Sequence, residues 1–110
     1  MLELLELETR IHMDQTLIAR LCQRYHLCSL WLYGSVLRAD FDPEASDVDV
    51  MIQISPEWAD ISVMALEEEL TLALGRHADV VCAHRMNPHY VNEVIATGMA
   101  LWTTKPSTQK

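Results

Sequence analysis

Residues 32–54 read LYGSVLRADFDPEASDVDVMIQI and combine a Gly-Ser pair with an Asp-x-Asp pair. Gly34 and Ser35 follow one apolar run, and Asp47 and Asp49 stand at the head of another. Because side chains alternate along a strand, two aspartates two residues apart point to the same face. Hard divalent cations prefer such closely spaced carboxylate oxygens. A Gly-Ser turn can offer backbone N–H groups and a hydroxyl to a phosphate. The segment therefore predicts a metal-dependent enzyme that handles a nucleoside triphosphate.

The length and composition of the chain indicate one small folded domain. The 110 residues favour a single domain over residues 1–110, with its core at about 14–103 and a flexible tail at 105–110. Half of the residues are hydrophobic, which argues against intrinsic disorder. The net charge of −8 argues against independent nucleic-acid binding, which needs a basic surface. An acidic chain can still hold ATP with magnesium, and it suits a basic protein partner.

The cysteines and the apolar runs bear on where the protein works. Cys22, Cys28 and Cys82 make an odd count without CxxC spacing, which favours reduced thiols over a zinc site or disulfides. The apolar runs are too short to cross a bilayer, and the acidic start is unlike a secretion signal. We therefore expect a cytoplasmic protein that does not bind membranes.

Helix signals recur along the chain. Leucines near the N-terminus predict a helix over residues 1–12, either an amphipathic end helix or a surface for another chain. Capping residues, Pro at the first helical position and terminal Gly predict the further helices, over residues 14–24, 55–74 and 87–98, with a short one at 35–39.

Strand signals alternate with these helices. Apolar alternation predicts strands over residues 27–33, 47–54, 78–83 and 99–103. In the second strand the valines and isoleucines set an apolar face, which leaves Asp47 and Asp49 on the opposite one. The expected fold is α/β (α+β), a small mixed sheet of about four strands flanked by helices.

The order Gly34-Ser35, Arg38, Ser46-Asp47-Val48-Asp49 resembles the signature of the nucleotidyltransferase (polymerase β-like) superfamily. The chain is similar over residues 14–103 to its minimal nucleotidyltransferase (MNT) branch, the antitoxins of HEPN–MNT toxin–antitoxin pairs. Asp79, in the segment ADVVCA, matches the third carboxylate of that branch.

This resemblance implies an enzyme that transfers AMP from ATP to a tyrosine hydroxyl of a HEPN ribonuclease toxin. It implies Asp47, Asp49 and Asp79 as catalytic ligands of two Mg²⁺ ions. It implies nucleotide binding by four residues: Gly34, Ser35, Arg38 and Ser46.

Other interpretations of the same residues remain open. Asp47 and Asp49 could be exposed acids at the start of a strand, and Asp79 an ordinary strand residue. Arg38 could pair with a nearby aspartate, and Ser46 could only turn the chain. At the level of function, the antitoxin could mask the toxin without catalysis, or the acceptor could be a small molecule. Tyr33 is expected in the core, and the run Glu67-Glu68-Glu69 is expected on a solvated face rather than at a metal site.

Overall fold

The computed structural model describes residues 6, 11, 13–39, 41–42, 46–58 and 63–104. Apart from Glu6 and Ile11, the helix predicted over residues 1–12 lies outside this range, as does the tail at 105–110.

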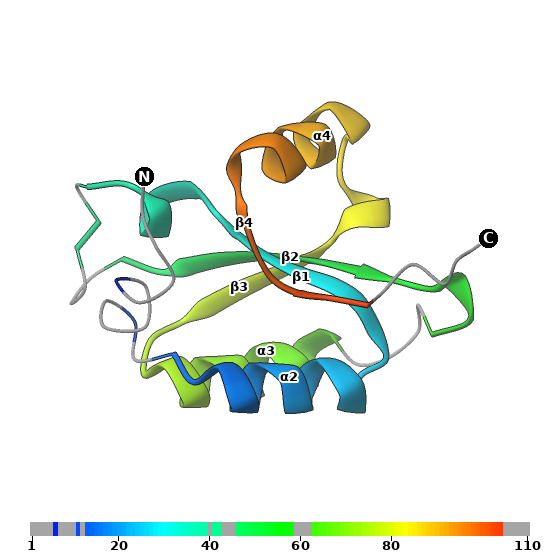
Figure 1. The fold of residues 1–110 in the computed structure, drawn as a ribbon, viewed down its shortest axis with the longest axis horizontal. Coiled ribbons are helices and arrows are strands. Elements are labelled where there is room, and N and C mark those ends of the chain that lie inside the picture. Colours follow the sequence, from blue (N-terminus) through cyan, green and yellow to red (C-terminus); the bar gives the residue numbers. More distant parts are fainter. Residues whose placement is uncertain are drawn as a thin grey trace.

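The centre of the fold is a four-stranded mixed sheet (Figure 1). Its strands run in the order β3-β2-β1-β4. The pair β2–β3 is parallel, whereas β1 runs antiparallel to both β2 and β4. The strand bounds are β1 Leu27–Tyr33, β2 Val48–Ile54, β3 Ala78–Cys82 and β4 Met99–Thr103. The predicted mixed α+β sheet is confirmed, with each strand within one residue of its expected bounds.

Three α-helices and three 3₁₀ turns precede or connect the strands in the described part of the chain. The α-helices are α2 Gln15–Arg24, α3 Val63–Leu74 and α4 Pro88–Thr97. The 3₁₀ turns are η1 Gly34–Leu37, η2 Pro56–Trp58 and η3 Ala83–Arg85. The structure differs from the prediction after β2, because the Ser55-Pro56 signal begins a 3₁₀ turn and the described α-helix begins at Val63. Likewise, the short helix expected at 35–39 is a 3₁₀ turn that starts one residue earlier.

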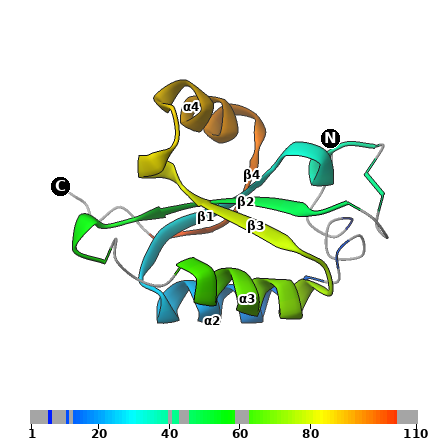
Figure 2. The ribbon, with the colours of Figure 1, turned by 180° about the vertical axis from the view of Figure 1, so that it is seen from behind.

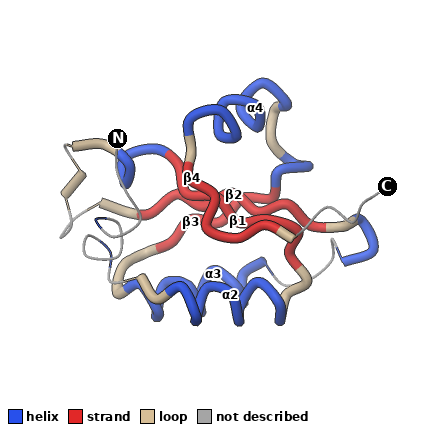
Figure 3. Tube along the Cα trace, viewed as in Figure 1, coloured by secondary structure: helices blue, strands red, loops and turns tan. Residues whose placement is uncertain are grey.

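The helices divide between the two faces of the sheet. Helices α2 and α3 lie side by side beneath it, and α4 lies above it (Figures 1 and 2). The tube in Figure 3 shows the same three layers, with the strands between the helices. Within the described ranges, one face is therefore covered by α2 and α3, and the other by α4.

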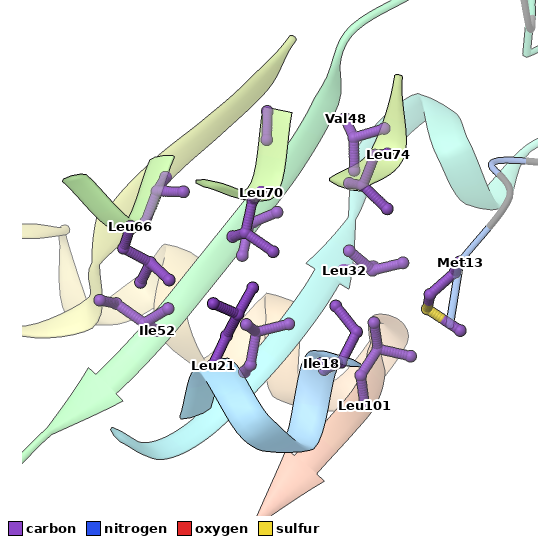
Figure 4. Close-up of a cluster of buried hydrophobic side chains, with 14 of the residues drawn as sticks. Met13, Ile18, Leu21, Leu32, Val48, Ile52, Leu66, Leu70, Leu74 and Leu101 are labelled. Atoms are coloured by element: carbon purple, nitrogen blue, oxygen red, sulfur yellow. The ribbon is translucent and has the colours of Figure 1, made fainter. Parts of the chain in front are cut away.

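The main core lies between the sheet and the pair α2–α3. Figure 4 shows Ile18 and Leu21 of α2 and Leu66, Leu70 and Leu74 of α3 turned toward the strands. From the sheet, Leu32, Val48 and Ile52 meet them, each exposed by 1% or less. Burying one such side chain stabilises the fold by about 1.5–3 kcal/mol. This packing fixes which face of β2 points away from α2 and α3.

Local signals set the helix ends as the sequence predicts. The Asp14 carboxylate accepts a hydrogen bond from the Thr16 amide at 2.9 Å, and the Asn87 side chain accepts one from the His89 amide at 2.8 Å. Helix α4 ends at Gly98, where a Cβ atom would lie 2.8 Å from the Leu32 carbonyl oxygen. Glycine there allows the end of α4 to approach β1 closely.

In the part of the chain that the structure describes, no helix has the length and apolar character required to cross a bilayer.

Candidate functional site

Two of the predicted carboxylates lie side by side on the face that carries α4. Val48 and Val50 are buried against α2 and α3, so the side chain of Asp49 between them points to the other face. In the parallel pair β2–β3, Asp49 is the register partner of Asp79. On the other side of β2, Tyr33 is the partner of Asp49. Tyr33, Asp49 and Asp79 therefore form one row across three strands.

Two hydrogen bonds between β3 and helix α3 hold Asp79 in this row. The Val80 amide donates to the Glu67 carboxylate at 2.8 Å, and the Ala78 amide donates to the Thr71 hydroxyl at 3.1 Å. These amides flank Asp79 on an edge strand, where they would otherwise lack a strand partner. Glu67 was expected on a solvated face, but it holds β3 instead.

The Asp49 carboxyl group is partly buried and lies near two other negatively charged side chains. Burial raises the pKa of Asp49 above its ordinary value, and the negative charges of Asp79 and Asp47 raise it further. The pKa of Tyr33 is also raised, by burial and then by Asp49 and Asp79. Tyr33 is half-buried beside the carboxylates rather than deep in the core, which corrects its expected place. A cation at this row would relieve the repulsion.

Gly34 lies directly against Asp49. Its φ of +79° is in the left-handed region that favours glycine, and a Cβ atom there would lie 2.8 Å from Asp49 Oδ2. The turn after β1 therefore approaches the carboxylate row as closely as only glycine allows. This contact joins the two halves of the Gly-Ser and Asp-x-Asp pattern in space.

The other predicted phosphate-binding residues occupy the loops at the same end of the sheet. Ser35 is half-buried in η1, and its carbonyl accepts from the Arg38 amide at 2.9 Å. Arg38 is exposed just after this turn. The Ser46 hydroxyl accepts from the Asp42 amide at 3.3 Å, and the Ser46 amide donates back to the Asp42 carbonyl at 2.9 Å. Ser46 thus closes the loop before Asp47, and its nucleotide role stays a prediction.

Asp47 lies one residue before β2 and next to His77, which precedes β3. Its Oδ2 atom lies 3.4 Å from His77 Nδ1, and both side chains are more than half exposed. Among the residues that the structure describes, no three His, Cys, Asp or Glu side chains are grouped to hold a metal ion. The donor chemistry nevertheless fits Mg²⁺, since the row presents carboxylate oxygens whose charges crowd one another.

Gln53 is a further polar residue of this face, and the sequence motifs do not include it. It lies two alternations beyond Asp49 on β2 and therefore shares its face. Its Oε1 accepts from the Ser29 hydroxyl at 2.5 Å, and Ser29 in turn accepts from Trp31 Nε1 at 3.0 Å. The period of two that placed Asp49 could have identified it.

Comparison with known proteins identifies the family. A profile of the polymerase beta nucleotidyltransferase family matches residues 15–107, which is most of the chain. No curated protein matches the sequence.

Several solved structures share the fold. A toxin–antitoxin complex with AMP-PNP is 22% identical, with a TM-score of 0.69 over 84% of this chain and 76% of that one. A complex of tri-AMPylated Shewanella oneidensis HEPN toxin with MNT antitoxin is 21% identical, with a TM-score of 0.62 over 90% and 74%. A candidate minimal nucleotidyltransferase is 26% identical, with a TM-score of 0.63 over 80% and 96%. The predicted resemblance is confirmed at the level of family and fold: this chain belongs to the polymerase beta nucleotidyltransferase family.

Proposed function

We propose that this chain is a Mg²⁺-dependent antitoxin that transfers AMP from ATP to a tyrosine hydroxyl of a HEPN toxin. The observation that carries the proposal is the row of Asp49 and Asp79, with Gly34 in contact with Asp49. A carboxylate pair beside a Gly-Ser turn suits a triphosphate whose charge is balanced by cations. The HEPN and MNT complexes of similar fold supply the partner class.

The carboxylates and the residues of the neighbouring loops have separate tasks in this reaction. Bound Mg²⁺ ions would neutralise charge on the attacking and leaving oxygens. Asp47 and Asp49 would hold the metal ions, and Asp47 is exposed enough to turn from His77 toward Asp49. Gly34 and Ser35 bind the outer phosphates through N–H groups and the hydroxyl. Arg38 adds a positive charge at the phosphate end.

The acceptor end belongs to Asp79. The tyrosine oxygen attacks the α-phosphorus, a new P–O bond forms, and pyrophosphate leaves with the electrons of the broken P–O bond. Asp79 accepts the proton of the tyrosine hydroxyl. Because Asp79 is exposed on an edge strand, a protein substrate can reach it.

The test is transfer of AMP in the assembled pair. The purified chain, the cognate toxin, Mg²⁺ and ATP are combined, and the toxin is analysed by intact mass and peptide mapping. We expect AMP on a toxin tyrosine and loss of ribonuclease activity. Asp79→Asn should abolish both, whereas Glu68→Gln, an exposed charge change on the α3 side, should preserve both. A toxin without AMP after this incubation contradicts the proposal.

Steric masking is the second candidate function. It is favoured by exposed apolar side chains on α4, since Tyr90 is 60% exposed and Ile95 is 44% exposed. Asp49→Asn distinguishes the two functions, because masking survives the substitution and catalytic neutralisation does not. We also propose a cytoplasmic location, which the free cysteines Cys22, Cys28 and Cys82 support.

A further inference from the structure

A pocket opens on the α4 side of the sheet, beyond the carboxylate row. Its volume is about 380 Å³, within the rough 300–1,000 Å³ range of small-molecule sites. It lies where β2 ends beneath η3 and α4, and Figure 2 shows η3, in yellow, joining β3 to α4 above the sheet. Its lining includes Gln53, Ala83, His84, Val91 and Asn92. Among the residues that the structure describes, no Asp, Glu, Lys or Arg lines it, although the chain has a net charge of −8.

A hydrogen-bonded relay determines how Gln53 faces this pocket. The Trp31 indole can only donate, so the Ser29 hydroxyl accepts from it and directs its own proton to Gln53 Oε1. Ser29 is only 4% exposed, so this relay is shielded from water. With Oε1 engaged, the Gln53 amide nitrogen is left as the donor for a ligand. The pocket therefore combines apolar walls with an oriented hydrogen-bond donor.

The distance between the pocket and the carboxylates indicates which kind of ligand the pocket binds. Gln53 lies four residues beyond Asp49 on the same strand face, a separation of about 13 Å at the usual strand rise. A nucleoside monophosphate spans a similar distance when it is measured from its phosphorus atom to the edge of its base and one hydrogen bond to the protein is added. Half-exposed Val81, two residues beyond Asp79 on β3, provides apolar surface between the two ends. Gly34 and Ser35 lie on the opposite side of the carboxylate row, where the outer phosphates belong.

We propose that this pocket binds the nucleobase of the triphosphate, with the Gln53 amide donating to an acceptor atom of the base. The inference rests on the proposed nucleotidyltransferase function and adds the subsite that recognises the uncharged end of the substrate. A neutral lining suits a heteroaromatic ring, whose polar edge needs a few fixed partners.

The first experiment compares ATP with inorganic tripolyphosphate, which carries the phosphates but no base. Both are titrated by calorimetry against the whole chain with Mg²⁺. The wild type should bind ATP more tightly than tripolyphosphate. Val91→Trp, which fills the pocket, should weaken ATP binding to the level of tripolyphosphate and leave tripolyphosphate binding unchanged. Ile95→Trp adds a large side chain to the same helix outside the pocket lining and should change neither affinity.

A second variant tests the donor and does not depend on added bulk. Gln53→Glu keeps the acceptor for Ser29 but replaces the amide donor with oxygen. It should weaken ATP binding about three- to tenfold, in line with the loss of one hydrogen bond, and raise KM for ATP with kcat unchanged. Tripolyphosphate binding should change little, because the new charge lies more than a Debye length, about 8 Å, from the phosphates.

The outcomes separate this inference from the function on which it rests. If folded Val91→Trp and Gln53→Glu both bind ATP as the wild type does, the base lies elsewhere and the inference is wrong. If Val91→Trp does not fold by circular dichroism, the Gln53→Glu result decides alone. If the wild type binds neither ATP nor tripolyphosphate, the proposed function fails and the inference fails with it.

Discussion

The two faces of β2 are made by one run of alternating residues, yet their surroundings differ. On the α2–α3 face, Val48, Val50 and Ile52 are exposed by 1% or less. On the α4 face, Asp49 and Gln53 keep part of their surface, and only Met51 between them is fully buried. The covered face supplies packing energy. The open face keeps charges that repel one another, which destabilises the fold without a ligand.

This comparison predicts that stability and activity can be removed separately, one from each face. The largest effect is expected from Asp49→Asn on the open face. AMP transfer should fall by roughly two to three orders of magnitude or more, as when one preorganised electrostatic group is removed. The melting temperature without metal should stay the same or rise, because a repelled carboxylate is gone. Activity assays and thermal unfolding of the same preparation check this, and a large drop in melting temperature would contradict it.

On the covered face, Leu70→Ala should do the opposite. Leu70 is 1% exposed, and its truncation should lower the free energy of unfolding by about 2–5 kcal/mol. Leu72 on the same helix is 79% exposed, so Leu72→Ala should change stability by no more than about 0.5 kcal/mol. Urea denaturation measures both. At a temperature where Leu70→Ala is folded, its activity per folded molecule should equal that of the wild type.

Two glycines with similar backbone angles test the contact between the turn after β1 and Asp49. Gly34 and Gly75 have φ values of +79° and +70°, so alanine at either should cost roughly 1–2 kcal/mol of backbone strain. Only Gly34 has Asp49 in the way, since nothing lies within 4 Å of a Cβ atom at Gly75. Gly34→Ala should therefore lower both stability and transfer, whereas Gly75→Ala should lower stability alone. Equal activity of the two variants would show that the contact with Asp49 is unimportant.

The smallest effect concerns pH. The pKa of Asp49 is raised in the folded state, so the folded protein holds its proton to higher pH than the unfolded chain does. Its contribution to stability is complete below the unfolded value near 3.8 and is lost as the pH rises through the folded pKa. Asp49→Asn should therefore gain stability relative to the wild type between acidic and neutral pH. Thermal unfolding without metal, at a series of pH values, measures this difference.

Much of the fold could be predicted because its signals are local. The alternation of Val48, Asp49, Val50 and Met51 predicts the strand and its two faces. The pair Asn87-Pro88 predicts the start of α4. The Gly-Ser and Asp-x-Asp pattern likewise identified the family.

The remaining features depend on contacts between distant segments. The position of Tyr33 beside Asp49 follows from strand pairing, not from its apolar neighbours. Glu67 reaches β3 because of how α3 packs, and its neighbours in the sequence suggested a solvated face. The turn of Asp47 toward His77 joins residues thirty positions apart, which no local pattern contains. The same holds for the relay from Trp31 through Ser29 to Gln53.

The parallel register of β2 and β3 has an evolutionary consequence. Asp49 and Asp79 meet because their backbones are paired, and the length of the chain between them does not affect that pairing. The connecting segment can gain or lose residues in its turns while the two acids stay opposite each other. A shift of β3 by one residue would instead turn Asp79 into the packed interior. We therefore expect homologues to vary freely in the length of this connection. We expect them to keep the two aspartates at paired positions of β2 and β3, on the same face of the sheet.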